Sequence, residues 1–205
     1  MNTPIDVFSE WAKNGKDEGM ERHHYQSVMN MINFASSKLS KYSFIDAGCG
    51  NGWVIRKVAE DPKCSKAIGV DGSKNMIDKA KRLDVKNKYY CEDLLTWVPN
   101  EKADIIHSME VFYYFDNPGN LIKHINNNWI KIGGRLIMGI DFYIENKTSH
   151  SWQKECGISI MKLYSEIEWK KFFKNAGLSK VESWRHGESK DLSLIHISEP
   201  TRRIT

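Results

Sequence analysis

The stretch FIDAGCGNG at residues 44–52 limits what this chain can fold into more than any other part of the sequence. It begins as an apolar strand, reaches the acidic Asp46 and breaks into a turn that carries Gly48, Gly50 and Gly52. Glycine has no Cβ, so such a turn can bend sharply and let the backbone approach a ligand. The residues that follow have a helical apolar pattern, and free N–H groups at the start of a helix suit a polar ligand. The turn therefore predicts either a nucleotide-like cofactor site or a tight structural turn without a ligand.

Two later segments favour the cofactor. An apolar strand at residues 66–71 ends on Asp71, where a doubly wound fold places the carboxylate that binds ribose hydroxyls. A third strand at residues 87–92 is followed by Asp93. Parallel strands that each end near an acid at the same edge of a sheet describe a binding crevice at that edge.

Strands and helices alternate along the chain. Apolar runs and capping signals predict strands at residues 43–47, 66–71, 87–92, 103–108, 134–140 and 178–186, and helices at residues 52–60, 74–82, 118–130 and 166–176. This order favours an α/β fold of the doubly wound kind, with a mostly parallel sheet and helices on both faces. With 205 residues and 40% hydrophobic content, the chain can form one compact domain with its own core.

The acid-ended segments resemble the motifs of the class I S-adenosylmethionine-dependent methyltransferases. FIDAGCGNG looks like the first motif of that family, IGVDGS at residues 68–73 like the second, and CEDLL at residues 91–95 like the third. The helix, Gly-Gly turn and strand expected around residues 118–140 look like the later part of the same fold. The resemblance implies a methyltransferase that uses S-adenosylmethionine as its cofactor.

The resemblance also implies roles for individual residues. Asp46 would lie near the amino acid end of the cofactor, Asp71 would hold the ribose and Asp93 the exocyclic amine of adenine. At Gly72 many members carry a larger apolar residue that packs on adenine, so another side chain would have to cover the base. The cofactor site implied in this way consists of Asp46, Gly48, Cys49, Gly50, Asn51, Gly52, Asp71, Gly72, Met76, Asp93, Leu94 and Ser108, with Met76 or Leu94 as the cover.

Polar and aromatic residues after the fourth and fifth strands are the candidates for the acceptor side of the site. These are Glu110, Tyr113, Tyr114, Asp141, Tyr143 and Trp152, joined by Trp11 from the N-terminal segment. Each of them could instead pack a loop. Methyl transfer needs a general base only when the attacking atom carries a proton that must leave. The sequence therefore assigns no catalytic residue.

Residues 1–40 form a helical segment ahead of the cofactor-binding domain, which we place at residues 41–191. Phe8 and Trp11 are aromatic anchors, and residues 25–32 follow the pattern of an amphipathic helix. In the family that the chain resembles, such a segment often folds over the cofactor as a lid, which excludes water from the reacting atoms. The alternative is a helix that only covers the sheet.

We expect residues 192–205 to be a non-native tail. The stretch LSLIHISEPTR at residues 192–202 resembles the in-frame translation of a transposase adapter used in sequencing libraries. Members of the family usually end with an antiparallel strand between the fifth and sixth strands, reached here through a turn at residues 187–191. The chain is therefore expected to lack its native last strand. Residues 192–198 are apolar enough to fill that position, with a loss of stability.

Composition argues against several other kinds of site. The cysteines, Cys49, Cys64, Cys91 and Cys156, include no Cys-x-x-Cys pair, and the 7 histidines lack metal-ligand spacing, so we expect reduced thiols and no metal site. The sequence has no signal segment and no stretch of membrane-spanning length, which predicts a cytoplasmic protein. The net charge of +4 is spread among acidic residues, which argues against nucleic acid as a ligand.

The function predicted from the sequence is methyl transfer from S-adenosylmethionine to a small-molecule acceptor, by a monomer or weak homodimer. No Asn/Asp-Pro-Pro-Tyr/Phe run and no Pro-Cys nucleophile pair is present, which argues against methylation of nucleic-acid bases. Two alternatives remain open. One is a non-catalytic module that binds the cofactor, and the other is a protein or RNA methyltransferase whose partner supplies specificity.

Overall fold

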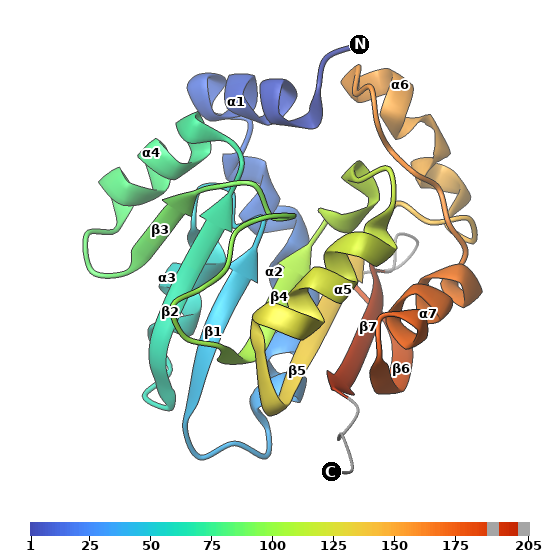
Figure 1. Ribbon diagram of the computed structural model, residues 1–205. Coiled ribbons are helices and arrows are strands. Elements are labelled where there is room, and N and C mark those ends of the chain that lie inside the picture. The colour runs from blue at the N-terminus through green and yellow to red at the C-terminus, as the bar shows by residue number, and fades with distance from the viewer. Residues whose placement is uncertain (188–192, 201–205) are drawn as a thin grey trace.

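One seven-stranded sheet forms the centre of the molecule (Figure 1). The computed structural model describes residues 1–187 and 193–200. In space the strand order is β3-β2-β1-β4-β5-β7-β6. Neighbouring strands are parallel except at β7, which is antiparallel to both β5 and β6. The strands are β1 Tyr42–Ala47, β2 Cys64–Asp71, β3 Lys88–Cys91, β4 Ala103–Met109, β5 Ile130–Ile140, β6 Leu178–His186 and β7 Ser193–Pro200.

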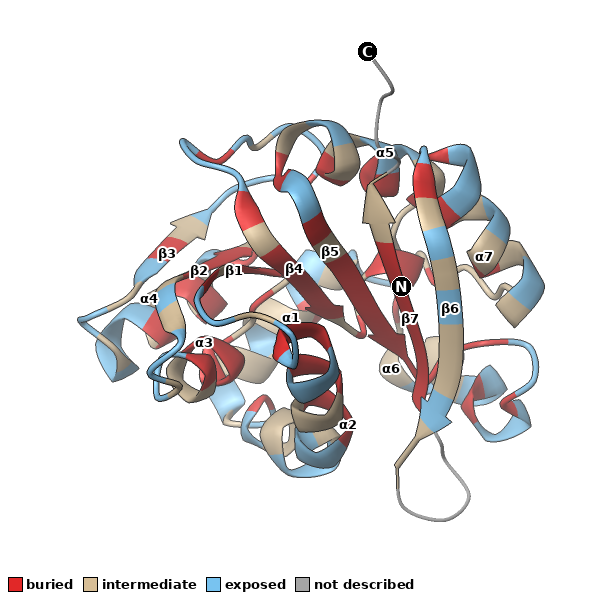
Figure 2. Ribbon diagram, turned by 90° about the horizontal axis from the view of Figure 1, so that it is seen from below, coloured by how far each residue is buried: buried red, intermediate tan, exposed pale blue. Residues whose placement is uncertain are grey.

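Helices cover both faces of this sheet (Figure 2). α2, α3 and α4 pack on one face, and α5 and α7 on the other. α1 lies across the edge where the parallel strands end, next to α4. The helices are α1 Pro4–Asn14, α2 Glu18–Ser36, α3 Trp53–Val58, α4 Lys74–Leu83, α5 Pro118–Asn128, α6 Trp152–Cys156 and α7 Glu166–Asn175, with short 3₁₀ segments at Phe112–Tyr114 and Lys147–Ser151.

The alternation of side chains along the strands produces two separate cores. In β1, Phe44 faces the core under α2 and α3, whereas Ile45 faces the core under α5 and α7. Ile105 and Ile106 divide in the same way in β4. Successive residues of a strand point to opposite faces, so strands that are apolar at every position must be buried on both sides. This is the physical reason why the continuous apolar runs of the sequence predicted a sheet between two layers of helices.

The predicted fold class is confirmed, and each predicted strand and helix is present, most of them with ends shifted by a few residues. The largest shift is in β5, which starts at Ile130 instead of residue 134 and contains the Gly-Gly pair that the sequence placed in a turn. The expected helix starts at Asn117 and Ser165 are confirmed, since each side chain accepts a hydrogen bond from the first turn of its helix. Ser165 and Glu168 form the capping box.

The tail fills the last-strand position, as its apolar sequence had allowed. Residues Ser193–Pro200 form β7 in that position, with Leu194 opposite Ile140 on β5 and opposite Arg185 on β6. The apolar pattern of this segment is sufficient to pair with both neighbours. The expected turn falls outside the described residues at positions 188–191, as do Leu192 and residues 201–205 of the tail. The non-native origin of the tail stays a prediction.

β7 fills its position with several polar side chains. His196 is fully buried and its ring stacks on Phe173, with 5.6 Å between ring centres. The hydroxyl of Ser198 is buried and has no hydrogen-bond partner. The hydroxyl of Ser193 does find a partner in Ser27 of α2, at 2.9 Å. A buried polar group without a partner costs stability, which agrees with the predicted loss of stability at this strand.

His196 makes the stability of the sheet sensitive to acid. Burial lowers the pKa of His196 from 6.5 to about 4. The folded state therefore prefers the neutral ring, and the stability that this gives is complete above pH 6.5 and is lost as the pH falls towards 4. We expect the free energy of unfolding of the wild type to fall by on the order of 1–3 kcal/mol more than that of His196→Gln over this range. Urea denaturation at several pH values measures the difference, and the exposed His150→Gln serves as control. Parallel curves for wild type and His196→Gln would contradict the assignment.

Candidate functional site

The glycine-rich turn after β1 is shaped by close packing. Gly48 has a φ of +81°, and a Cβ at this position would lie 2.3 Å from a methyl carbon of Val111. Gly52 has a φ of +77°, and a Cβ there would meet the ring of Tyr89 at 2.5 Å. Larger residues are thus excluded at both positions by backbone conformation and by contact. The turn leaves the backbone of Gly48 and Gly50 open towards a cavity above the sheet.

Asp71, at the end of β2, holds this turn in place. One carboxylate oxygen accepts the N–H of Gly50 at 3.0 Å, and the other accepts the N–H of Ser73 at 2.7 Å. Burial raises the pKa of Asp71, and the two N–H bonds oppose that rise. Each oxygen keeps a second lone pair, so the carboxylate can still accept hydrogen bonds from a ligand.

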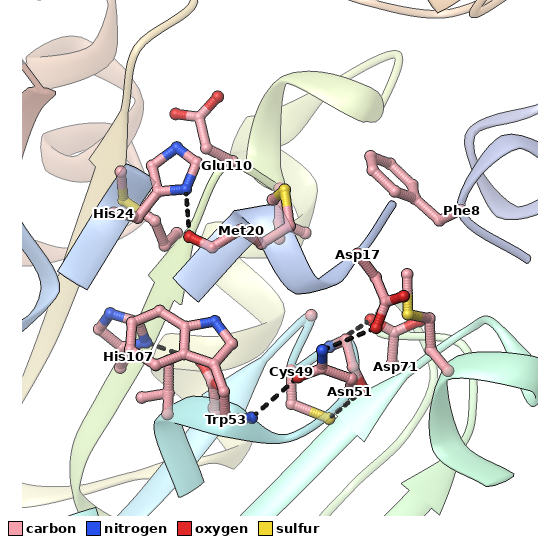
Figure 3. A pocket seen from close by; sticks show the side chains of 17 residues that line it. Phe8, Asp17, Met20, His24, Cys49, Asn51, Trp53, Asp71, His107 and Glu110 are labelled. Carbon is pink, nitrogen blue, oxygen red and sulfur yellow. Dashed lines mark hydrogen bonds and ion pairs between the residues drawn. The ribbon is translucent and has the colours of Figure 1, made fainter. Parts of the chain in front are cut away.

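Three cavities line the edge where the parallel strands end. The central cavity, of about 650 Å³ with its open mouth included, is shown in Figure 3 and lies over the glycine-rich turn. The β3-side cavity, of about 900 Å³, includes Ile5, Gly72, Asp93 and Leu94. The β5-side cavity, of about 1680 Å³ with its open mouth included, has Trp11, Tyr113, Tyr114, Asp141 and Trp152 in its wall.

The three cavities share wall residues and lie side by side along this edge, and together we call them the groove. Asp71 and Gly48 line both the central and the β3-side cavity. Glu110 and His24 line both the central and the β5-side cavity. Phe8 borders all three. A ligand that extends from the β3 side past Asp71 would therefore present its far end at Glu110 and His24.

The N-terminal segment forms one wall of this groove. Phe8 of α1 contacts Tyr114 edge to face, with 5.3 Å between ring centres. Asp17, between α1 and α2, is 1% exposed and accepts hydrogen bonds from Asn51 Nδ2 at 2.7 Å and from Lys79 Nζ at 2.9 Å. The segment is thus tied directly to the glycine-rich turn and to α4.

Ile5 occupies the space that the missing side chain of Gly72 leaves open. A Cβ at Gly72 would lie 3.0 Å from Cδ1 of Ile5, and both residues line the β3-side cavity. Of the two residues expected to cover an adenine ring, Leu94 lines the same cavity, whereas Met76 lines the central one. The sequence could not indicate Ile5, because it comes from a helix far away in the chain.

Asp46 is paired with a histidine that the sequence did not single out. Nδ1 of His107 lies 2.7 Å from Oδ1 of Asp46, and both side chains are buried. Nε2 of His107 is buried without a hydrogen-bond partner. Both residues line the central cavity, which gives its floor one acidic group and one ring nitrogen able to bind a polar ligand.

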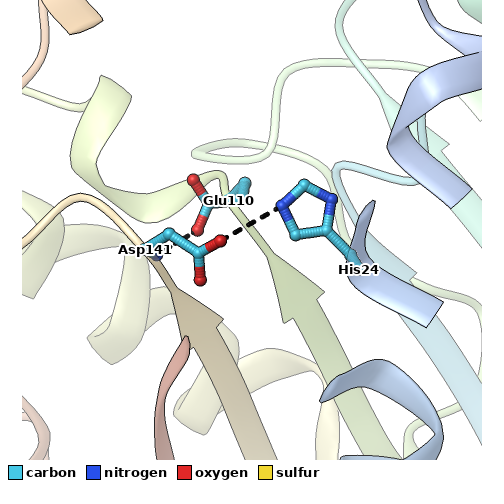
Figure 4. A group of neighbouring side chains, drawn as sticks. All are labelled: His24, Glu110 and Asp141. Carbon is cyan, nitrogen blue, oxygen red and sulfur yellow. Dashed lines mark hydrogen bonds and ion pairs between the residues drawn. The ribbon is translucent and has the colours of Figure 1, made fainter. Parts of the chain in front are cut away.

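His24, Glu110 and Asp141 form a second polar cluster, at the junction with the β5-side cavity (Figure 4). Nε2 of His24 lies 3.4 Å from Oδ2 of Asp141. Burial lowers the pKa of His24, but the bond to Asp141 and the charges of Glu110 and Asp141 outweigh this effect and raise it to about 9. Burial and the charge of Asp141 raise the pKa of Glu110 to about 8. The cluster can therefore hold or release protons near neutral pH.

Most of the residues expected from the sequence meet at the groove. Those that line one or more of its cavities are Asp46, Gly48, Cys49, Gly50, Asn51, Asp71, Gly72, Met76, Asp93, Leu94, Trp11, Glu110, Tyr113, Tyr114, Asp141 and Trp152.

The structure places three of the expected residues outside these cavities. Gly52 packs against the ring of Tyr89, which leaves no room for a side chain at this position. Ser108 is buried, and its hydroxyl donates to the carbonyl of Ala47 at 2.8 Å, which fixes β4 to β1. Tyr143 is buried beneath the guanidinium of Arg185, which lies 5.7 Å from the ring centre.

The residues that line the groove without having been expected there include Ile5, Asp17, Met20, His24 and His107. His24 lies four residues before Val28 and seven before Met31, both buried on α2, so the helical period places it on the inward face. This helical period was the signal in the sequence that could have identified His24. Asp17 and His107 carried no comparable signal.

Comparison with known proteins identifies the family. A family model described as a methyltransferase domain matches residues 12–183, which is most of the chain. The chain belongs to this family. The predicted resemblance to the class I S-adenosylmethionine-dependent methyltransferases is thereby confirmed.

The methyltransferase domain is similar to two kinds of curated methyltransferase. It is 25% identical over 148 residues to malonyl-[acyl-carrier protein] O-methyltransferase 2 of Ilyobacter polytropus, covering 69% of this chain and 56% of that protein. It is 28% identical over 92 residues to trans-aconitate 2-methyltransferase of Rhizobium rhizogenes, covering 45% of this chain and 36% of that protein. The chain thus spans about half the length, or less, of the curated relatives it matches.

Solved structures share the fold of the methyltransferase domain. A chain of the complex that contains the Trm112 methyltransferase activator of Haloferax volcanii is 22% identical, with a TM-score of 0.78 and coverage of 98% of this chain and 100% of that one. The N-methyltransferase NodS of Bradyrhizobium japonicum, in complex with S-adenosyl-L-homocysteine, is 17% identical, with a TM-score of 0.67 and coverage of 86% of each chain.

Among the helices of residues 1–187 and 193–200, none is long and apolar enough to cross a membrane.

Asp17 should be the residue through which the N-terminal segment is held on the groove. Replacing it by alanine leaves Asn51 and Lys79 without their buried acceptor, and hydrogen bonds to charged groups contribute about 1.5–3 kcal/mol each. We expect Asp17→Ala to lower the free energy of unfolding by on the order of 2–3 kcal/mol in urea denaturation. The control is Glu18→Ala, whose side chain is 70% exposed and also reaches Lys79. Equal effects of the two substitutions would contradict the special role of Asp17.

Proposed function

We propose that this chain transfers a methyl group from S-adenosylmethionine to a small-molecule acceptor. The observation that carries the proposal is the row of adjoining cavities, with Asp71 shared by the first two and Glu110 and His24 shared by the last two. A nucleoside bound by Asp71 directs the rest of an extended cofactor over the glycine-rich turn and towards the β5-side cavity. Membership in the methyltransferase-domain family supports this reading.

In this proposal each part of the cofactor has its own partners. The carboxylate of Asp71 accepts hydrogen bonds from the ribose hydroxyls. Asp93 accepts from the adenine amine, and Ile5 and Leu94 cover the base. Asp46 and His107 bind the amino acid end beside Gly48 and Gly50. S-adenosylmethionine held by these residues would supply an electrophilic methyl group and would leave as S-adenosylhomocysteine.

The residues of the chain then mainly position the acceptor and exclude water. Proximity and alignment contribute on the order of 7–11 kcal/mol in the best intramolecular models. The N-terminal segment at residues 1–40 acts as a lid, with Phe8 at the meeting point of the three cavities. Where the acceptor carries a proton, Glu110 is placed to take it, because its raised pKa of about 8 suits proton transfer near neutral pH.

The β5-side cavity supports a small molecule as the acceptor. Its wall combines aromatic rings, from Trp11, Tyr113, Tyr114 and Trp152, with the acids Glu110 and Asp141. Curated relatives of the chain act on malonyl-[acyl-carrier protein] and trans-aconitate. We expect a small metabolite, and neither nucleic acid nor a lipid surface. A monomer or weak homodimer in the cytoplasm remains our prediction for the state and location of the protein.

A second candidate is a methyltransferase that needs a protein partner. The structural neighbour from Haloferax volcanii comes from a complex with a methyltransferase activator. At 22% sequence identity, the similarity between the two chains supports a shared fold and no more. The candidate predicts that the purified chain binds the cofactor weakly or is inactive until a partner is added.

Calorimetric titration with S-adenosylmethionine tests the cofactor site. We expect micromolar binding to the wild type and at least tenfold weaker binding to Asp71→Ala, which corresponds to about 1.4 kcal/mol. The matched control is Asp78→Ala, which removes an acid on α4 that pairs with Lys74. We expect its affinity to equal that of the wild type.

Circular dichroism of the same samples completes this experiment. A folded wild-type chain that shows no binding would contradict the proposal. If the cofactor binds, release of S-adenosylhomocysteine in the presence of a panel of carboxylic acids, amines and phenols identifies the acceptor class. Turnover with none of them until a partner protein is added would favour the second candidate.

A further inference from the structure

Three side chains of metal-ligand type converge between the central and β5-side cavities. His24 comes from α2, Glu110 directly follows β4, and Asp141 directly follows β5. Each offers one ligand atom, and these atoms all lie within 4.8 Å of one another. Figure 4 shows the imidazole of His24 facing the two carboxylates. Bonds from a transition-metal ion to nitrogen or oxygen are about 2.0–2.2 Å long, so the three atoms are close enough to surround one ion after small side-chain movements.

The three side chains are fixed in orientation by their surroundings. Nδ1 of His24 lies 3.0 Å from the carbonyl oxygen of Met20. A carbonyl can only accept, so Nδ1 carries the proton of this bond and Nε2 is the nitrogen that faces Asp141. Histidines that bind metals usually donate their other N–H to a carbonyl or carboxylate in this way. The carboxylate of Glu110 is held by the hydroxyl of Tyr113 and by the backbone N–H of Asp141.

The cluster also contains a carboxylate oxygen that lacks a hydrogen-bond partner. Oδ1 of Asp141 is buried and has no hydrogen-bond partner. The residue as a whole is 8% exposed. Among the described residues, no ion pair joins a lysine or arginine to Glu110 or Asp141, and Oδ2 of Asp141 lies 3.4 Å from Nε2 of His24. Buried carboxylate oxygens are normally paired or bound to a metal. A cation between the two acids would give Oδ1 of Asp141 a partner.

The geometry points to a site for one divalent transition-metal ion, held by His24, Glu110 and Asp141. One imidazole nitrogen with two carboxylate oxygens suits Mn²⁺, Fe²⁺ or Zn²⁺, whereas Ca²⁺ and Mg²⁺ prefer oxygen ligands alone. All three ligands line the β5-side cavity, from which an oxygen-bearing acceptor could complete the shell. The site goes beyond the proposed methyl transfer and does not depend on it, because metal binding is measured without cofactor or turnover.

Titration of the full chain with Mn²⁺ tests the site. Mn²⁺ is the probe of choice because it favours oxygen and nitrogen over the thiols of the chain. We expect one saturable site in calorimetry, and an electron spin echo signal that shows nitrogen from one imidazole bound to the ion. His24→Gln should abolish the nitrogen signal. His24→Gln and Asp141→Asn should each weaken binding at least tenfold.

The exposed neighbour on the same helix provides the matched control. His23→Gln should bind Mn²⁺ as the wild type does. Asp141→Asn retains the shape of the side chain and the N–H that holds Glu110, so it is the variant of choice if His24→Gln does not fold by circular dichroism. A folded wild type without a saturable site, or an equal loss in His23→Gln, would overturn the inference. The separate titration with S-adenosylmethionine shows whether the cofactor site is intact in the same sample, which keeps the two failures distinguishable.

Discussion

The two hydrogen bonds that Asp71 accepts are the interaction on which the groove depends. They connect the turn after β1, the end of β2 and the start of α4 through one carboxylate. Because β1 and β2 are parallel, their carboxyl ends meet at one edge, and Asp71 can reach the N–H of Gly50 across the gap. The path of the backbone over the sheet, and with it the floor of the central cavity, follows from this contact.

The acceptor side is built in a different way. Its walls come from the N-terminal segment, from residues after β4 and β5, and from α6. No single stretch of sequence contains it. Glu110 has a positive φ of 60°, which residues other than glycine rarely adopt. Such backbone conformations cluster at functional sites, where the surrounding structure holds them.

This difference explains what could be predicted from the sequence. The motifs with Asp46, Asp71 and Asp93 are local, so alternation and glycine spacing were enough to place them at the edge of a doubly wound sheet. The cluster of His24, Glu110 and Asp141 forms no recognisable motif in the sequence, since its members lie far apart on three separate elements. The prediction that no metal site exists rested only on the spacing of cysteines and histidines along the chain. That spacing does not show which residues the fold brings together. Ile5 beside Gly72 and Asp17 beside Asn51 belong to the same class of tertiary contacts.

The position of β7 has a consequence for the order in which the molecule can form. β6 pairs with β7 and β7 with β5, so among the described strands β6 is joined to the rest of the sheet through β7. During synthesis, β1 to β5 can pair as they leave the ribosome. β6 must wait for residues 193–200 before it has a neighbouring strand to pair with. Until then its backbone groups and the apolar face of α7 stay available to chaperones or to other chains.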